Sequence, residues 1–127
     1  MFKVFVVLGS LNALLTVAFG AFGAHGLKGS IPPHLFETYE TGVQYQMFHS
    51  LGMLLVAALS AALGDGRLLR WSGGLMQAGI VLFSGSLYVL SMTGITWLGT
   101  ITPFGGVSFL AAWFLLGMAA WKKAGKP

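Results

Sequence analysis

The chain has 127 residues, of which 56% are hydrophobic and only 8% are charged. A soluble domain carries about a quarter charged residues, so seven Lys and Arg with three Asp and Glu cannot cover a soluble surface. The absence of cysteine excludes disulfides, thiolate nucleophiles and Cys-ligated metals. The net charge of +4 comes from scattered basic residues, so nucleic-acid binding is not expected. These values predict an integral membrane protein.

Four long apolar segments take up most of the chain, and each approaches the roughly 20 residues that cross a hydrocarbon core of about 30 Å. Because backbone groups in lipid must be hydrogen-bonded within the protein, all four are predicted to be helices. The expected spans are residues 4–24, 33–63 including an outer extension before about residue 42, 71–92 and 103–121. Residues 1–127 are therefore predicted to form a single transmembrane domain, an all-α four-helix antiparallel bundle.

The basic residues beside the span ends predict the orientation. With four crossings, Lys28 stands alone on one side, and the other side carries six basic residues. By the positive-inside rule the richer side is cytoplasmic, so both termini are predicted to be cytoplasmic. The six residues are Lys3, Arg67, Arg70, Lys122, Lys123 and Lys126.

Small and polar residues form a narrow stripe along the first span. At about 100° per residue they fall on one helical face. In lipid such a face is where helices approach closely, because small residues permit contact and polar residues avoid hydrocarbon. The predicted packing residues are Gly9, Asn12, Thr16, Gly20 and Gly23.

Polar side chains also gather in the outer half of the second and third spans. The second span presents one polar face around His49, and the third presents another, from which Ser86 points away. An ionisable residue inside a membrane helix is a functional candidate by default. The alternative for His49 is a neutral histidine that is hydrogen-bonded to a neighbouring helix. The predicted ligand-binding residues are His25, Tyr45, Gln46, His49, Ser84 and Tyr88.

His25 can join this group only if the first helix ends beside it. A helix continued to residue 25 would point the histidine at lipid. Gly23 and Gly26 flank it and make a turn easy to form, so the expectation is that His25 turns inward.

The sequence offers little support for catalysis or for a metal. His34 and Glu37 are three residues apart, but no His-x-x-x-His or His-Glu-x-x-His pattern is present. None of the acidic residues shares a buried stripe with a serine and a histidine. We therefore expect no catalytic residue, no metal and no cofactor, and a non-enzymatic protein is favoured over an enzyme.

Four segments, taken in order, resemble the small membrane-protein family catalogued as domain-of-unknown-function family 423. They are GAFGAHGL at 20–27, YETGVQYQMFHS at 39–50, FSGSLY at 83–88 and ITPFGG at 101–106. The resemblance implies a four-helix, multi-pass protein of the bacterial inner (cytoplasmic) membrane with no established activity. It carries over no catalytic residue.

The favoured hypothesis is a protein that binds, or transports, a small polar ligand or a lipid headgroup in an outward-facing polar pocket. The alternative is a non-catalytic interaction or assembly protein whose polar stripes serve helix packing and homo-oligomerisation. A membrane metalloenzyme comes third. Membrane lipids are the expected partners, with a second copy of the chain under the alternative.

Overall fold

The computed structural model describes residues 1–124, and all regular elements in that part of the chain are helical. This confirms the predicted all-α class. The π-helical turn Gly23–Leu27 continues the first helix, and the π-helical turn Ile80–Ser84 joins the third helix to the fourth. The α-helices are α1 (Phe2–Phe22), α2 (Pro33–Leu63), α3 (Arg67–Gly79), α4 (Gly85–Thr93) and α5 (Thr102–Ala124).

Four helical segments in the described part of the chain are long and apolar enough to cross a membrane. This confirms the predicted four-helix membrane fold. With 31 residues, α2 is about 46 Å long, which exceeds a hydrocarbon core of about 30 Å. The segments are Phe2–Leu27, Pro33–Leu63, Arg67–Thr93 and Thr96–Lys123.

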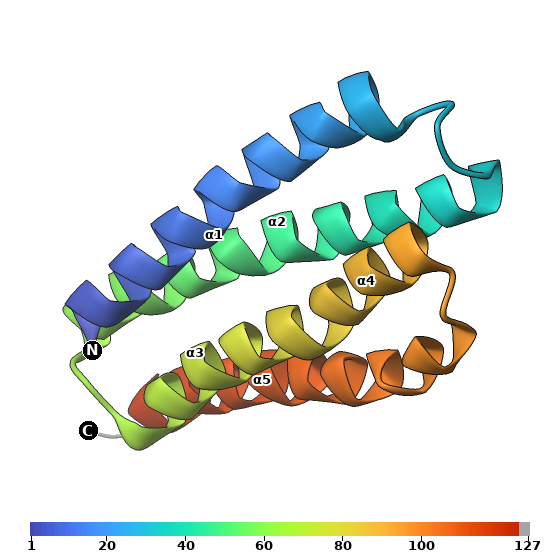
Figure 1. Cartoon of the computed structure of the whole chain (residues 1–127). Coiled ribbons are helices and arrows are strands. Elements are labelled where there is room, and N and C mark those ends of the chain that lie inside the picture. Colours follow the sequence, from blue (N-terminus) through green and yellow to red (C-terminus); the bar gives the residue numbers. More distant parts are fainter. Residues whose placement is uncertain (125–127) are drawn as a thin grey trace.

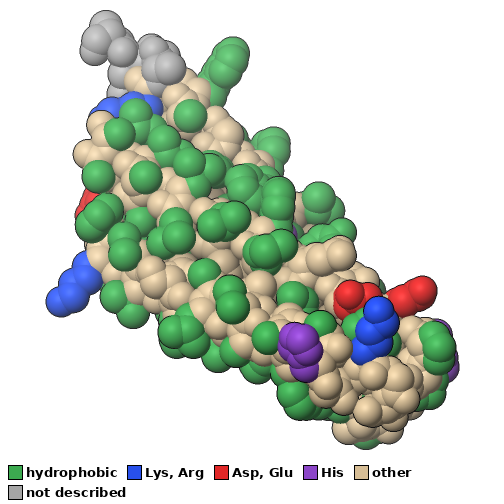
Figure 2. All heavy atoms as spheres, turned by 90° about the horizontal axis from the view of Figure 1, so that it is seen from above, with side chains coloured by type: hydrophobic (Ala, Val, Ile, Leu, Met, Phe, Trp, Pro, Cys, Tyr) green, Lys and Arg blue, Asp and Glu red, His purple; other side chains and the backbone are tan. Residues whose placement is uncertain are grey.

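The chain turns back at each connection, so that α1 lies beside α2, and α3 lies beside α5 (Figure 1). The start of α1 and the end of α5 lie at the same end of the molecule, here called the termini end. The opposite end, with residues 28–32 and 94–101, is the loop end. Charged side chains gather toward these two ends on the face shown in Figure 2, with hydrophobic side chains between them. The charge count predicts that the termini end faces the cytoplasm; Lys126, counted there, lies outside the described residues.

The small-residue stripe of α1 lies against α2. Gly9 and Gly23 are both buried. A Cβ atom at Gly9 would lie 2.8 Å from Cγ of Leu54, and one at Gly23 would lie 2.6 Å from a ring carbon of Tyr39. Packing around Gly20 is looser, because a Cβ there would lie 3.8 Å from its nearest neighbour, Cγ1 of Val43. At Gly9 and Gly23 the close helix approach therefore depends on the absence of a side chain.

The apolar core lies where α2, α3 and α5 meet, with Phe5 added from α1. The buried core residues are Phe5, Met53, Val56, Ala57, Leu69, Met76, Ile80, Phe109, Ala112 and Leu116.

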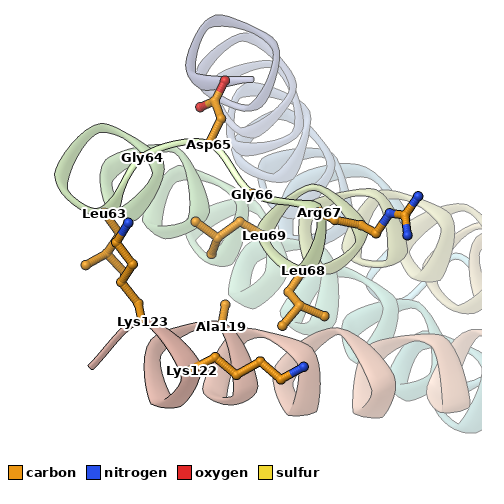
Figure 3. Close-up of a pocket in the computed structure, with 10 residues that line it drawn as sticks. All are labelled: Leu63, Gly64, Asp65, Gly66, Arg67, Leu68, Leu69, Ala119, Lys122 and Lys123. Carbon is orange, nitrogen blue, oxygen red and sulfur yellow. The ribbon is translucent and has the colours of Figure 1, made fainter. Parts of the chain in front are cut away.

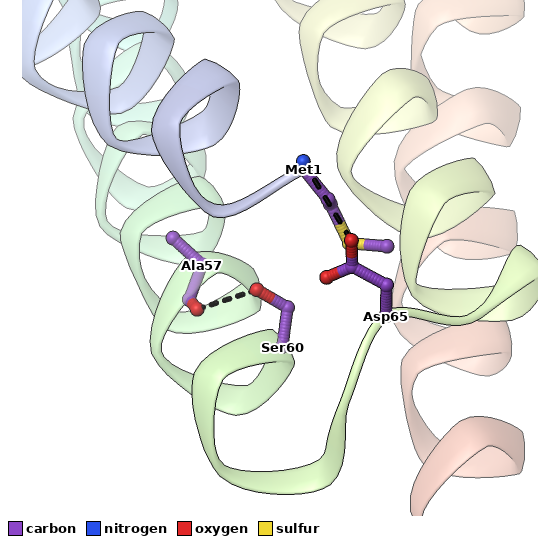
Figure 4. Close-up of polar contacts among 4 residues, drawn as sticks. All are labelled: Met1, Ala57, Ser60 and Asp65. Carbon is purple, nitrogen blue, oxygen red and sulfur yellow. Dashed lines mark hydrogen bonds and ion pairs between the residues drawn. The ribbon is translucent and has the colours of Figure 1, made fainter.

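Two polar contacts lie at the termini end. The N-terminal ammonium of Met1 lies 3.8 Å from a carboxylate oxygen of Asp65, and Ser60 donates to the carbonyl of Ala57 (Figure 4).

The third span presents its polar face toward α1 and α2, and Ser86 lies on another side. Ser84 and Ser86 are both buried but against different helices, so Ser86 points away from the polar face, as expected. Ser84 donates to the carbonyl of Gly42 at 2.7 Å, while the hydroxyl of Ser86 lies 2.6 Å from that of Thr102. In addition, α2 covers one side of α4 and the start of α5 covers another.

Candidate functional site

A polar network links three of the four spans at the middle of the bundle. We use this name for Asn12, Gln46, Gln77 and Tyr88. Nε2 of Gln46 donates to Oδ1 of Asn12 at 3.1 Å, and Oε1 of Gln46 accepts from the hydroxyl of Tyr88 at 2.6 Å. Nδ2 of Asn12 donates to Oε1 of Gln77 at 2.9 Å and to the carbonyl of Leu8 at 2.8 Å. Each amide of the network therefore has a partner on another span.

Neighbouring hydroxyl groups bond within their own helices. Thr16 donates to the carbonyl of Asn12 at 2.8 Å, and Ser50 donates to the carbonyl of Gln46 at 2.5 Å. Within residues 1–124, every buried side-chain nitrogen and oxygen has a hydrogen-bond partner. Since an unpaired polar group is costly in an apolar interior, this arrangement allows the polar residues to lie inside the bundle.

Tyr88 is enclosed by aromatic rings and by backbone. Its ring centroid lies 5.3 Å from that of Tyr39 and 5.2 Å from that of Phe19. The hydroxyl of Tyr39 donates to the carbonyl of Phe19 at 2.6 Å. A Cβ at Gly42 would lie 2.9 Å from a ring carbon of Tyr88. These contacts hold the Tyr88 hydroxyl against Gln46.

His49 is separate from the polar network and bonds toward α5. Its Nδ1 lies 2.8 Å from the carbonyl oxygen of Tyr45, and its Nε2 accepts from Nε1 of Trp113 at 2.9 Å. A carbonyl only accepts and an indole N–H only donates, so the imidazole is neutral with its proton on Nδ1. The ring also stacks on Phe109, with centroids 3.5 Å apart and planes 9° apart. At 2% exposure, His49 has both nitrogens engaged by protein groups.

A groove beside His49 opens on the outer surface of the bundle between α2, the π-helical turn and α5. Its volume is about 460 Å³, and we call it the aromatic groove. Tyr45 lines it, 43% exposed, with its ring centroid 4.5 Å from that of Phe83. On the other wall Val107 and Leu110 are 64% and 74% exposed. The lining residues are Tyr45, Phe48, His49, Phe83, Pro103, Gly106, Val107, Phe109, Leu110 and Trp113.

The predicted ligand-binding residues fall into three separate places. Gln46 and Tyr88 meet in the polar network, and Ser84 bonds to the α2 backbone beside it. Tyr45 and His49 line the aromatic groove instead. The side chains of the polar network hydrogen-bond directly to one another rather than lining a pocket. The expected convergence on one polar pocket is therefore not what the structure contains.

His25 lies apart from both groups. The first span does not break at Gly23 but continues through the π-helical turn, where the N–H of Lys28 bonds to the carbonyl of Gly23 at 2.9 Å. His25 is exposed on this turn. The expected inward turn of His25 is wrong, because the wider helical turn accommodates the glycines without ending the helix.

Two partners in these groups, Trp113 and Gln77, have a signal in the sequence. Tryptophan is enriched at membrane interfaces, but Trp113 lies in the middle of α5, where its N–H needs a buried acceptor. Gln77 and Asn12 both lie inside apolar spans, so each needs a polar partner. Among residues 1–124, no three His, Asp or Glu side chains are close enough to share a metal ion.

Comparison with known proteins gives the family. The model of the family described as "Protein of unknown function (DUF423)" matches residues 19–106. The UPF0382 membrane protein YwdK of Bacillus subtilis is 54% identical over 120 residues, which are 94% of this chain and 98% of that protein. A UPF0382 membrane protein of Staphylococcus aureus is 47% identical over 97% of this chain and 99% of its own length. No solved structure matches the chain. The chain therefore belongs to the DUF423 family and is a membrane protein.

Proposed function

We propose that this protein is a non-enzymatic, multi-pass protein of the bacterial inner membrane that binds an amphiphilic lipid, whose apolar chain occupies the aromatic groove. The observation that carries the proposal is the lining of that groove. Aromatic rings from three spans surround an opening whose other wall is exposed and aliphatic. Ligand sites are typically concave and mostly apolar, with volumes of about 300–1,000 Å³. A groove of this kind on the lipid-facing side of a membrane protein takes an acyl or isoprenoid chain.

The length of the groove suits one end of such a chain. It runs along α5 from Pro103, near the loop end, to Trp113, which is about 15 Å at about 1.5 Å per residue. Its loop-end side is predicted to face outward, so the ligand would enter from the outer leaflet.

Tyr45 supplies a hydrogen-bonding group for the polar end of the lipid. Among residues 1–124, the hydroxyl of Tyr45 forms no hydrogen bond with another residue. Tyrosine pairs an apolar ring with a polar tip, so the ring lines the groove while the hydroxyl meets an ester carbonyl or a hydroxyl.

The hydrogen bonds of the polar network favour an apolar ligand over a small polar ligand. The amides and hydroxyls of the network bond to each other across spans, so a polar ligand would have to displace those bonds. The sequence-based hypothesis of a lipid headgroup is kept in part, with the chain of the lipid as the main contact.

Filling the groove tests the proposal. A Cβ at Gly106 or at Gly117 meets no atom within 4 Å, but only Gly106 lines the groove. In a background where Trp71, Trp97 and Trp121 are phenylalanine, Trp113 fluorescence reports the groove alone. In vesicles of phosphatidylcholine with dibrominated acyl chains, bromine should quench Trp113.

We expect Gly106→Phe to remove most of this quenching and the matched variant Gly117→Phe to retain it. Equal quenching in the two variants would mean that no lipid chain enters the groove. Folding of both variants is checked by their helical circular dichroism.

One observation favours the alternative hypothesis, in which the polar stripes serve helix packing and assembly. The polar network already satisfies its members, so its role is complete without any ligand. Under that hypothesis α5 docks a second copy, and Gly106→Phe would abolish chemical cross-linking between copies while leaving Trp113 quenching unchanged.

A further inference from the structure

Another cavity lies at the termini end, and its lining differs from that of the aromatic groove. Its volume is about 250 Å³, and it lies between the α2–α3 connection, the first turn of α3 and the last turns of α5 (Figure 3). We call it the basic pocket. Its lining residues are Leu63, Gly64, Asp65, Gly66, Arg67, Leu68, Leu69, Ala119, Lys122 and Lys123.

Three basic side chains stand around an apolar floor. Lys122 and Lys123 extend from α5 on different sides of the pocket, and Arg67 lies at its rim on α3 with its guanidinium directed outward (Figure 3). The floor is formed by residues such as Leu69, which is 3% exposed. Within residues 1–124, none of the three cations forms an ion pair.

The one acidic residue of the pocket is already paired. Asp65 carries its carboxylate toward the N-terminal ammonium of Met1, at 3.8 Å (Figure 4). In Figure 3 its side chain points away from both lysines. The pocket therefore keeps a surplus of positive charge.

The backbone adds to that surplus. The first residue of α3 is Arg67, after Gly66 in an extended conformation, and no side chain caps this end. A helix N-terminus carries partial positive charge, so Arg67 in the first turn is unfavourable there unless an anion is nearby. The basic pocket thus combines three side-chain cations with the positive end of a helix.

The depth of the pocket in the membrane fits a lipid headgroup. Trp121, next to Lys122, is 82% exposed, and tryptophan is enriched at the level of the headgroups. Cytoplasmic basic pockets between membrane helices bind anionic headgroups. We infer that the basic pocket binds the phosphate group of an anionic phospholipid in the inner leaflet.

The test compares two pairs of charge removals. One double variant, Lys122→Gln and Lys123→Gln, removes two cations from the pocket. The control double variant, Lys3→Gln and Arg70→Gln, removes two exposed cations that do not line the pocket. Binding of phosphatidylglycerol and of phosphatidylcholine to the purified protein in detergent is measured by native mass spectrometry.

We expect the pocket pair to bind phosphatidylglycerol about 30-fold more weakly, because each basic residue near an anionic headgroup contributes about fivefold. The control pair should change by less than about fivefold. Equal losses in the two pairs, or equal binding of both lipids to the unmodified protein, would overturn the inference.

A further variant keeps the test independent of folding. Gly66→Asp places a carboxylate at the pocket, where a Cβ meets no atom within 4 Å. Aspartate is also a favourable N-cap, so this variant should be at least as stable while binding phosphatidylglycerol more weakly. Unchanged binding in Gly66→Asp would contradict the inference.

Inorganic phosphate distinguishes the source of the phosphate group. The lipid is expected to remain bound in its presence, because its chains add apolar contacts. Displacement by inorganic phosphate, with direct phosphate binding in the absence of lipid, would overturn the lipid as occupant and assign the pocket to a soluble anion.

Discussion

The indole N–H of Trp113 donates to Nε2 of His49 at 2.9 Å and thereby joins α5 to α2 inside the membrane. The bond uses the one imidazole nitrogen that a metal or a polar ligand would otherwise need, since Nδ1 already bonds to the Tyr45 carbonyl. His49 is consequently a structural histidine whose ring forms part of the wall of an apolar groove.

Removing the donor should destabilise the protein. Trp113→Phe keeps an aromatic ring but leaves Nε2 of His49 without a partner. We expect the free energy of unfolding to fall by about 1–2 kcal/mol. Unfolding in detergent, followed by circular dichroism, measures this. Trp121→Phe is the control, because Trp121 is 82% exposed; similar stability of the two variants would contradict the assignment.

The tautomer of His49 is directly observable. With ¹⁵N-labelled histidine, the His49 ring should show a protonated Nδ1 and an unprotonated Nε2 in NMR spectra. The Nε2 signal should shift in Trp113→Phe while Nδ1 remains protonated. A signal from the opposite tautomer would exclude the bond from Trp113.

The polar network makes a similar prediction for Gln46. Gln46→Leu leaves Oδ1 of Asn12 and the hydroxyl of Tyr88 without their partners. We expect a loss of about 1–3 kcal/mol in the free energy of unfolding. Gln44→Leu, on the exposed side of the same helix, should change it by no more than about 0.5 kcal/mol. Equal effects at residues 44 and 46 would show that the network adds nothing to stability.

Two adjacent glycines of α5 should respond with opposite signs. A Cβ at Gly105 would overlap the backbone nitrogen and Cα of Phe83, which cannot move aside as a flexible side chain can. Gly105→Ala should therefore lower the melting temperature. At Gly106 a Cβ meets no atom within 4 Å, so Gly106→Ala should be neutral or gain up to about 1 kcal/mol from helix propensity. Matching shifts would mean that α5 packs differently on the π-helical turn.

Much of the fold could be predicted because membrane helices follow from local composition. The apolar spans set the four helices, and the expected second helix over residues 33–63 coincides with the observed Pro33–Leu63. The candidate site is less predictable, because local composition does not decide whether a helix ends at a pair of glycines or continues past them. The π-helical turn Gly23–Leu27 continues the first helix, so His25 stays exposed instead of turning inward.

By itself, the sequence determined that the chain is apolar enough to require helices and that its charges lie at their ends. Hydrophobicity and backbone hydrogen bonding in lipid act on each segment separately, so they can be evaluated without knowing its neighbours. Only the tertiary structure decided that Gln46 pairs with Tyr88 and Asn12 while His49 pairs with Trp113. Such pairings depend on how two helices are rotated against each other. That rotation is set by packing contacts, such as the glycines of α1 against α2, between residues far apart in the chain.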